Sequence, residues 1–268
     1  MGTIRVIVSG AAGRMGRAAV RAISAQPDLQ VVGALGRSRA LGEDAGVVAG
    51  TGALGVTIGA DLDSLLAGTS ADVLVEFAPG ESAVAHARAA VARGVRPVVG
   101  ATGLPSDAVD DLAALCGRHG LGAVIAPNFA LGAVLMMRFS QQAARYFPHA
   151  EVIELHHDRK RDAPSGTAAK TAQVIAQARG EPPPPRVQEE EAVPGARGGT
   201  LGGVRVHSVR LPGLVAHQEV IFGGVGQVLT IRHDSLSEDS FMPGLLLAVR
   251  RVMELRGLVY GLEHLLDL

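Results

Sequence analysis

The chain has 268 residues, and at about 150 residues per domain this length indicates two domains or one large one. Its 25 basic and 26 acidic side chains give a net charge of −1, which argues against a nucleic-acid-binding protein, because such proteins carry a strong basic excess. Hydrophobic residues make up 47% of the chain and charged residues 19%, which excludes a chain that is disordered throughout.

The first part of the chain alternates short Val- and Ile-rich runs with Ala- and Leu-rich segments of helical period. The runs predict strands at residues 4–8, 30–35, 56–58, 72–77, 97–99 and 123–126. The helical patterns cover residues 15–25, 61–66, 81–93 and 106–119. Apolar strands separated by helices are typical of a parallel sheet covered on both faces. We therefore predict a Rossmann-type, doubly wound α/β domain over residues 1–127.

The pattern changes after residue 128, and we predict an α+β domain with an open, mainly antiparallel sheet over residues 128–237. Its helices are expected at 131–147 and 166–178, with a strand at 150–156 between them. Four consecutive prolines, 182–185, predict an exposed loop over 180–202. Runs at 204–211, 215–222 and 227–233, separated by glycines, predict an antiparallel meander. A last helix near 238–254 is expected to pack back on the first domain, which then includes residues 238–268.

No segment of the sequence has the pattern of a membrane span. The most apolar window, residues 121–137, is interrupted by Pro127, Asn128 and Gly132. The sequence starts directly with a strand-like run and shows no basic region followed by a cleavage site. We expect a soluble, cytoplasmic protein without a membrane partner.

A glycine-rich turn follows the first predicted strand. Gly10, Gly13 and Gly16 have the spacing G-x-x-G-x-x-G, a variant of G-x-G-x-x-G. Glycines between a buried strand and a helix allow backbone N–H groups to approach a pyrophosphate at the helix N-terminus. The position predicts a dinucleotide site, with ordinary turn glycines as the alternative. The segment consists of Gly10, Ala11, Ala12, Gly13, Arg14, Met15 and Gly16.

The end of the second predicted strand bears on the choice of nucleotide. Sites that prefer NAD usually place an acid there, but the end of this strand and the residues after it contain no acid before Glu43. Arg37, with Arg14 or Arg39 as further candidates, can instead pair with a 2′-phosphate, because guanidinium is a good phosphate fork. A solvated surface charge is the alternative for each arginine. The pattern favours NADPH, with NADH possible.

Residues 156–161 form a basic segment between a predicted strand and a helix. Five of its six side chains can carry positive charge, namely His156, His157, Arg159, Lys160 and Arg161. Pro164 stops any earlier helix, and Ser165 is a good N-cap for the next one. The backbone N–H groups of Gly166 and Thr167 then form an anion site at the helix N-terminus.

This segment suits a small substrate that bears carboxylates. An imidazole can act as acid or base near neutral pH, so His156 is a candidate for proton transfer together with Lys160. A solvated basic face is the alternative, but the link to a capped helix after a dinucleotide domain favours the functional interpretation.

Other common sites are missing from the sequence. Cys116 is the only cysteine, which excludes an internal disulfide and a thiolate zinc site, and we predict that it is a buried helical residue. The chain contains neither G-x-x-x-x-G-K-[ST] nor H-E-x-x-H. His207, His217 and His233 lie one per predicted strand, which indicates structural roles. We expect no bound metal ion.

Together these motifs resemble the bacterial 4-hydroxy-tetrahydrodipicolinate reductase (dihydrodipicolinate reductase) family over nearly the whole chain. The most specific part is Glu154-Leu-His-His-Asp-Arg-Lys160 followed by Asp162-Ala-Pro-Ser-Gly-Thr-Ala168. Further matches lie at residues 10–16, 100–103, 126–129 and 207–210.

The resemblance implies an enzyme that reduces 4-hydroxy-tetrahydrodipicolinate to tetrahydrodipicolinate by hydride transfer from NAD(P)H, with loss of water, in lysine biosynthesis via diaminopimelate. It also implies a homotetramer assembled through the sheet of the second domain, which binds the cyclic dicarboxylate substrate. His156 would be the proton donor and acceptor, and Lys160 the proton donor. The substrate carboxylates would be held by His157, Gly166 and Thr167, with Ser165 at the cap. The cofactor site would be lined by Gly10 to Met15 and by Gly100, Ala101, Thr102, Ala126, Pro127, Asn128 and Phe129.

Two positions depart from the family's pattern. Gly36 stands where relatives that use NADH well often carry an acid, and Ala101 stands where we expect a hydroxyl or another small residue. Two other functions are compatible with the fold: a different amino-acid oxidoreductase, such as an aspartate- or homoserine-type dehydrogenase, and a non-catalytic NADP-binding sensor. The presence of both His156 and Lys160 favours the reductase.

Overall fold

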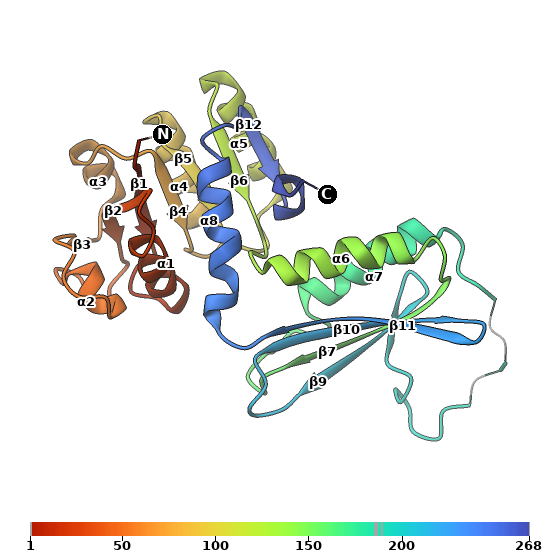
Figure 1. The fold of residues 1–268 in the computed structure, drawn as a ribbon. Helices are drawn as coiled ribbons and strands as arrows, with labels where there is room; N and C mark the ends of the chain where they lie inside the picture. The colour runs from red at the N-terminus through yellow and green to blue at the C-terminus, as the bar shows by residue number, and fades with distance from the viewer. Residues whose placement is uncertain (1, 185–186, 189, 268) are drawn as a thin grey trace. The chain divides into compact units, whose positions relative to one another are not determined.

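The computed structural model describes residues 2–184, 187–188 and 190–267. Positions 185, 186 and 189, which belong to the loop predicted over 180–202, lie outside the described residues. The chain forms two compact units (Figure 1). The first combines Met1–Phe129 with Glu238–Leu268, and the second is Ala130–Ser237.

The first unit is built on a seven-stranded sheet with the order β12-β6-β5-β4-β1-β2-β3. Each of its strand pairings is parallel. The order reverses between β1 and β4, which makes the carboxyl ends of these two strands the expected ligand-binding edge of a doubly wound sheet. The strands are β1 Ile4–Ser9, β2 Leu29–Leu35, β3 Ile58–Gly59, β4 Val73–Glu76, β5 Arg96–Val99, β6 Gly122–Ile125 and β12 Gly257–Tyr260.

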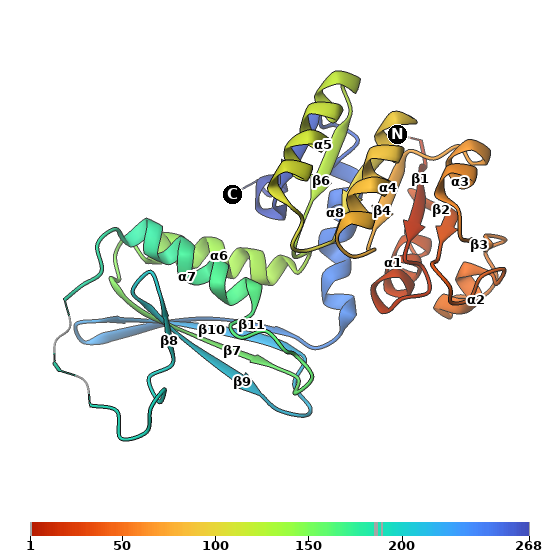
Figure 2. The ribbon, with the colours of Figure 1, turned by 180° about the vertical axis from the view of Figure 1, so that it is seen from behind.

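Helices cover both faces of this sheet, as the two opposite views show (Figures 1 and 2). One face carries α3 (Leu62–Gly68), α4 (Glu81–Ala92) and α5 (Ser106–His119), and Cys116 of α5 is buried. The other face carries α1 (Arg14–Ser24) and α8 (Met242–Arg251), which contact each other. The predicted doubly wound α/β domain is therefore confirmed. The short elements are α2 Ala45–Ala49, η1 Glu238–Phe241 and η2 Leu262–Leu265.

The second unit packs two helices on one face of a five-stranded sheet (Figure 1). The helices α6 (Leu131–Ala143) and α7 (Gly166–Arg179) contact each other and the strands beneath them. Alternate residues of β7 are buried under these helices, as a sheet with one covered face requires. The sheet order is β11-β10-β7-β9-β8, with β7 His149–His156, β8 Gly199–Leu201, β9 Val204–Arg210, β10 Ala216–Gly224 and β11 Gln227–Ser235.

The antiparallel meander predicted from the last three runs is wrong in one pairing. β7 lies between β9 and β10, and β9 runs parallel to β7. The physical reason is the connection through α7, which returns the chain to the starting end of β7 and so makes β9 parallel to it. The other three pairings are antiparallel, so the sheet is mixed. Strand β8 lies inside the segment that was predicted as a loop.

The end of the chain also differs from the prediction. The single helix expected at 238–254 is divided into η1 and α8, and the chain then adds β12 to the first sheet beside β6. Gly257, with a φ of +105°, allows the sharp turn into this strand. Among the described residues, no helix is long and apolar enough to cross a membrane.

Candidate active site

The glycine turn between β1 and α1 has a backbone conformation and a close packing that favour glycine. Gly10 has a φ of +74°, and its carbonyl accepts a hydrogen bond of 2.9 Å from the N–H of Gly13. A Cβ atom at Gly16 would lie 2.1 Å from the same carbonyl oxygen, so the first turn of α1 can approach the loop only without a side chain there. Gly13 precedes α1, and no side chain caps this helix end. The turn therefore fits a pyrophosphate group.

A cleft of about 710 Å³ lies over this turn, at the carboxyl ends of β1, β2 and β4. Of the predicted cofactor residues, it brings together Gly10, Ala12, Gly13, Arg14, Met15, Gly16, Arg37 and Gly100. Ala11 is buried beneath the turn and does not line the cleft. The cleft thus lies at the edge of the sheet where the strand order reverses between β1 and β4.

The basic side of this cleft comes from the segment after β2. Arg37, Ser38 and Arg39 all line the cleft and are exposed. Arg14 also lines it, and its guanidinium forms an exposed ion pair of 3.2 Å with Glu238. Gly36 is tightly packed, because a Cβ atom there would lie 2.8 Å from Cγ2 of Ile58. A side chain at position 36 therefore requires Ile58 to move, which gives a steric reason for this departure from the family's pattern.

A second group of predicted cofactor residues lies away from this cleft. Ala101, Thr102, Ala126, Pro127 and Asn128 are not among its lining residues, and Ala101 and Ala126 are buried. Phe129 is buried as well and is connected to the cleft indirectly.

That connection is an aromatic pair. The rings of Phe77 and Phe129 meet edge to face, with centroids 6.5 Å apart. A Cβ atom at Gly100 would lie 2.8 Å from the ring of Phe77 and 3.0 Å from that of Phe129. Gly100 therefore leaves room for this pair, and Phe77 lines the cleft.

Sequence reasoning missed a buried carboxylate at the edge of the cleft. Glu76 ends β4 and is fully buried. One of its oxygens accepts a hydrogen bond of 2.5 Å from the amide of Ala78, and the other lies 2.7 Å from Nδ1 of His86, which lines the cleft. The bond to Glu76 raises the pKa of His86 despite the partial burial of the ring. A single acid in the apolar run Val73–Glu76 was the available signal.

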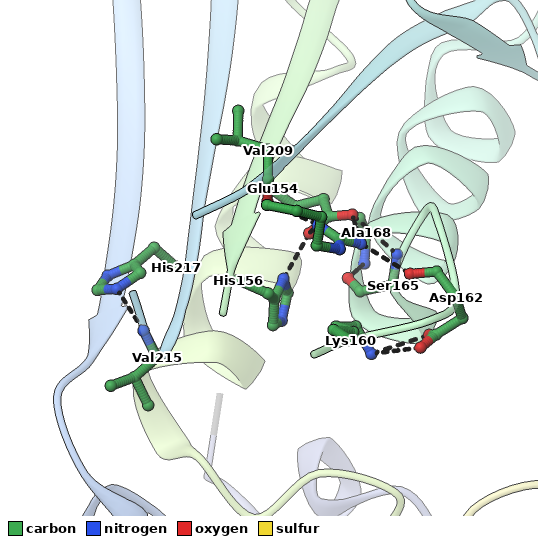
Figure 3. Close-up of polar contacts among 10 residues, drawn as sticks. Glu154, His156, Lys160, Asp162, Ser165, Ala168, Val209, Val215 and His217 are labelled. Carbon is green, nitrogen blue, oxygen red and sulfur yellow. Dashed lines mark hydrogen bonds and ion pairs between the residues drawn. The ribbon is translucent and has the colours of Figure 1, made fainter. Parts of the chain in front are cut away.

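In the second unit, the predicted proton-transfer residue His156 ends β7 and its ring is nearly buried. Its Nδ1 lies 2.5 Å from Oε2 of Glu154, a fully buried carboxylate on the same strand (Figure 3). Arg210 of β9 donates to both oxygens of Glu154, at 2.9 and 2.8 Å. Burial alone raises the pKa of Glu154, but hydrogen bonds from His156, Arg210 and Ser208 outweigh it and lower the value to about 2.

Lys160 lies in the loop that follows β7, near His156 (Figure 3). Its Nζ is 2.8 Å from each carboxylate oxygen of Asp162, and this bond lowers the pKa of Asp162. The side chain of Lys160 is 22% exposed and that of Asp162 is 61% exposed. The ammonium group thus already occupies a position in which it holds a carboxylate near the molecular surface.

The start of α7 completes this cluster. Ser165 is the N-cap, and its hydroxyl accepts a hydrogen bond of 3.2 Å from the amide of Ala168. Gly166 begins the helix with exposed backbone, and no heavy atom lies within 4 Å of an added Cβ. Nδ1 of His157 is buried and has no hydrogen-bond partner among the described residues. Such an unsatisfied nitrogen is available to a ligand. Glu154 thus joins His156 to the N-cap Ser165, and Gly166 and Thr167 follow as the first residues of α7.

Two other histidines of the second sheet, His207 and His217, are held by carboxylates. Nε2 of His207 lies 2.8 Å from Glu151, and Nδ1 of His217 lies 2.7 Å from Asp234. Nε2 of His217 also accepts from the amide of Val215 (Figure 3). In the described part of the chain, no group of three or more His, Cys, Asp or Glu residues is placed to hold a metal ion.

A doubly wound parallel sheet with a glycine turn at its cleft, joined to a mixed sheet that carries an imidazole and an ammonium group, defines the class of Rossmann-type oxidoreductases with a separate second domain. Family models for the N-terminal and C-terminal parts of dihydrodipicolinate reductase match residues 4–129 and 132–266. The chain belongs to the dihydrodipicolinate reductase family. The family and the oxidoreductase class predicted from the sequence are thus confirmed, and the fold implies a nicotinamide cofactor.

Individual relatives cover the whole chain. It is 55% identical to the 4-hydroxy-tetrahydrodipicolinate reductase of Moorella thermoacetica, over 99% of this chain and 98% of the relative. It is 51% identical to that of Desulfitobacterium hafniense strain DCB-2, over 100% of both. Among solved structures, a dipicolinate-bound dihydrodipicolinate reductase from Paenisporosarcina sp. TG-14 matches with a TM-score of 0.89 and 40% identity, covering 98% of this chain and 100% of that one.

Similarity in fold extends further than the family. The amine dehydrogenase of Mycobacterium smegmatis matches with a TM-score of 0.67 at 18% identity, over 96% of this chain and 94% of that one. At this identity the likeness concerns the fold alone.

Proposed function

We propose that this protein reduces 4-hydroxy-tetrahydrodipicolinate to tetrahydrodipicolinate, with loss of water, in the diaminopimelate route to lysine. The observation that carries the proposal is the cluster of His156, Lys160 and the open start of α7 within one unit. Relatives that are 55% and 51% identical are named as reductases of this substrate, and a solved relative binds dipicolinate. Two acidic groups on a small ring need cations and N–H donors, which this cluster offers.

His156 and Lys160 are the proposed proton-transfer residues. Because Nδ1 of His156 faces the ionised Glu154, Nε2 is the ring nitrogen that exchanges a proton with the substrate. Lys160 holds the carboxylate of Asp162, and a substrate carboxylate competes with that side chain for the same ammonium group. Proton delivery by Lys160 then follows the arrival of the substrate.

The substrate carboxylates are assigned to His157, Ser165, Gly166 and Thr167. The unsatisfied Nδ1 of His157 supports this assignment, as does the N-terminus of a 14-residue helix, where an anion is stabilised by up to about 2 kcal/mol when partly buried. The part formed by residues 128–237 is accordingly the substrate-binding domain, and residues 1–127 with 238–268 form the dinucleotide-binding domain.

The bound nicotinamide cofactor supplies the hydride. The glycine turn offers backbone N–H groups to its pyrophosphate, and Arg37 is the residue assigned to a 2′-phosphate, so NADPH is the preferred cofactor. Ala101, Thr102 and residues 126–129 are kept as cofactor contacts on the family resemblance alone.

The assembly we propose is a homotetramer built through the second sheet. Val152 of β7 points towards the helices, so Ile153 and Leu155 lie on the opposite face, where no helix of the described chain packs. Sedimentation equilibrium checks this assignment: a tetramer supports it, and a monomer at micromolar concentration contradicts it.

The decisive experiment generates the substrate in place with its synthase and follows the absorbance of NADPH and NADH separately. Oxidation that requires both the synthase and this protein is the expected result. No oxidation of either nucleotide would overturn the proposed reaction.

A separate variant tests the preference for NADPH over NADH. Arg37→Ala removes a charge-assisted hydrogen bond to the 2′-phosphate, so the KM for NADPH should rise about tenfold or more while that for NADH stays constant. Arg118→Ala, which removes an exposed arginine of α5, is the matched control. An equal rise of both KM values would contradict the preference for NADPH.

A further inference from the structure

The buried carboxylate of Glu154 bonds the ring of His156 and the amide of Ser165, the N-cap of α7. We propose that Glu154 is a positioning residue, which fixes the proton-bearing nitrogen of His156 and the start of α7 in one rigid arrangement. This inference rests on the proposed function, since it assigns a role to Glu154 in the same reaction.

Glu154 is a carboxylate at every pH at which the protein is expected to work. It is fully buried, yet it accepts two hydrogen bonds from the guanidinium of Arg210 and one from His156. A buried carboxylate with a bidentate guanidinium keeps its charge, because the paired cation and the hydrogen bonds offset the cost of burial.

The charge of Glu154 determines which nitrogen of His156 carries the proton. A carboxylate only accepts hydrogen bonds, so Nδ1 of His156, 2.5 Å away, must be its donor. In the neutral ring Nε2 is then the unprotonated nitrogen and can accept a proton. In the charged ring Nε2 carries that proton and can donate it. Without the carboxylate the ring can adopt the other tautomer, which presents an N–H group where a base is needed.

The same carboxylate also reaches the helix that holds the substrate. The amide of Ser165 donates to Oε1 of Glu154 at 3.2 Å, which ties the N-cap of α7 to β7. Arg210 extends this link, because it donates at 2.7 Å to the carbonyl of Asp162, the partner of Lys160. His156, Lys160 and the start of α7 are therefore connected through Glu154 and Arg210.

A second carboxylate on β7 offers a matched control. Glu151 also bonds an imidazole and a guanidinium, with His207 at 2.8 Å and Arg197 at 2.7 Å. It lies on the other face of the sheet, however, and its side chain is 35% exposed. It shares the chemistry of Glu154 without the link to His156.

The test compares Glu154→Gln, Glu154→Asp and Glu151→Gln. Glu154→Gln should lower kcat about 10²-fold to 10⁴-fold and leave the KM for the nucleotide unchanged, which is the order of loss seen when a catalytic histidine loses its orienting carboxylate. Glu154→Asp restores the charge and should recover part of kcat. Glu151→Gln should stay within threefold of the wild-type protein. A wild-type kcat for folded Glu154→Gln would overturn the inference, and so would an equal loss in a Glu151→Gln protein that keeps the wild-type sedimentation behaviour.

A spectroscopic measurement separates this inference from the proposed function. In the ¹⁵N-histidine spectrum, the His156 signals, identified by their loss in His156→Asn, should show Nδ1 protonated and Nε2 unprotonated in the neutral ring. This measurement needs no turnover, so an inactive wild-type protein overturns the reductase function while the tautomer still tests the role of Glu154. The opposite tautomer in the wild-type protein would overturn that role. Because this measurement uses the wild-type protein, it remains a test even if Glu154→Gln does not fold.

Discussion

The two units each contain a fully buried glutamate beside an imidazole. In the first unit Glu76 ends β4 and lies 2.7 Å from Nδ1 of His86. In the second unit Glu154 lies near the end of β7, 2.5 Å from Nδ1 of His156. The pairs differ in their other partners, because Glu154 is also held by the guanidinium of Arg210 at two oxygens, whereas Glu76 accepts a backbone amide.

This difference separates a structural ion pair from one that can work in proton transfer. The guanidinium of Arg210 stays charged at any relevant pH, so the burial of Glu154 does not depend on the charge of His156. Arg210 therefore compensates the charge of Glu154 independently of His156. The cation beside Glu76 is the titrating ring of His86, so that pair loses attraction when His86 is deprotonated.

The largest expected effect comes from replacing the imidazole of the second pair. His156→Asn should lower kcat about 10²-fold to 10⁴-fold, the usual contribution of a general acid–base group. Its effect on the free energy of unfolding should be small, because Arg210 still compensates Glu154. Steady-state kinetics and urea unfolding of the same preparation measure both quantities. A loss of stability without a loss of kcat would show that the pair of Glu154 and His156 is structural and does not take part in proton transfer.

The next largest effect concerns the permanent cation. Arg210→Met leaves Glu154 buried without its guanidinium, so the free energy of unfolding should fall by about 3–5 kcal/mol. Arg232→Met, which removes a half-exposed guanidinium paired with Glu219 and Asp234, is the control and should lower the free energy of unfolding far less, because surface ion pairs contribute little to stability. Urea unfolding at pH 7 checks this, and equal losses in both variants would contradict the role given to Arg210.

A smaller, pH-dependent effect is expected for the first pair. The folded protein raises the pKa of His86 above its ordinary value of 6.5, mainly through the bond to Glu76. The stability from this pair is therefore complete below about pH 6.5 and is lost as the pH rises through the raised value. His86→Asn should cost about 1–3 kcal/mol at pH 6 and progressively less at higher pH. Unfolding of both proteins from pH 5.5 to 9 tests this, and a difference that grows with pH would refute it.

The smallest effect should come from the surface pair that holds Lys160. Asp162→Asn removes a carboxylate whose side chain is 61% exposed, so the free energy of unfolding should change by no more than about 1 kcal/mol. Thermal unfolding measures the change. A loss of several kcal/mol would mean that Asp162, like Glu154, is part of the buried framework.

The fold was largely predictable from periodicity, and the exceptions have physical causes. Buried parallel strands such as β1 and β4 read as apolar runs, and the helices between them have a clear period. Periodicity does not specify which strands pair, so the parallel contact of β9 with β7 was missed. Strand β12 was missed because four residues beyond a helix give too short a pattern.

The site was predictable where its signal is local. The glycine turn and the segment from His156 to Thr167 are continuous in sequence, and each forms one cluster in space. Arg210 is 56 residues from Glu154, and nothing in the sequence pairs them before the sheet is formed. The steric demand on Gly36 by Ile58 likewise arises only when β3 packs beside β2.

The last strand has a consequence for biosynthesis on the ribosome. Because β12 pairs with β6 and α8 packs on α1, the first unit lacks an edge strand and a covering helix until residues 242–260 have been synthesised. The second unit is complete at Ser237. Domains usually fold in the order in which they emerge from the ribosome. Here the first unit is still incomplete when the second unit can already fold. Premature termination near residue 237 would therefore leave β6 as an open edge strand that is prone to aggregation.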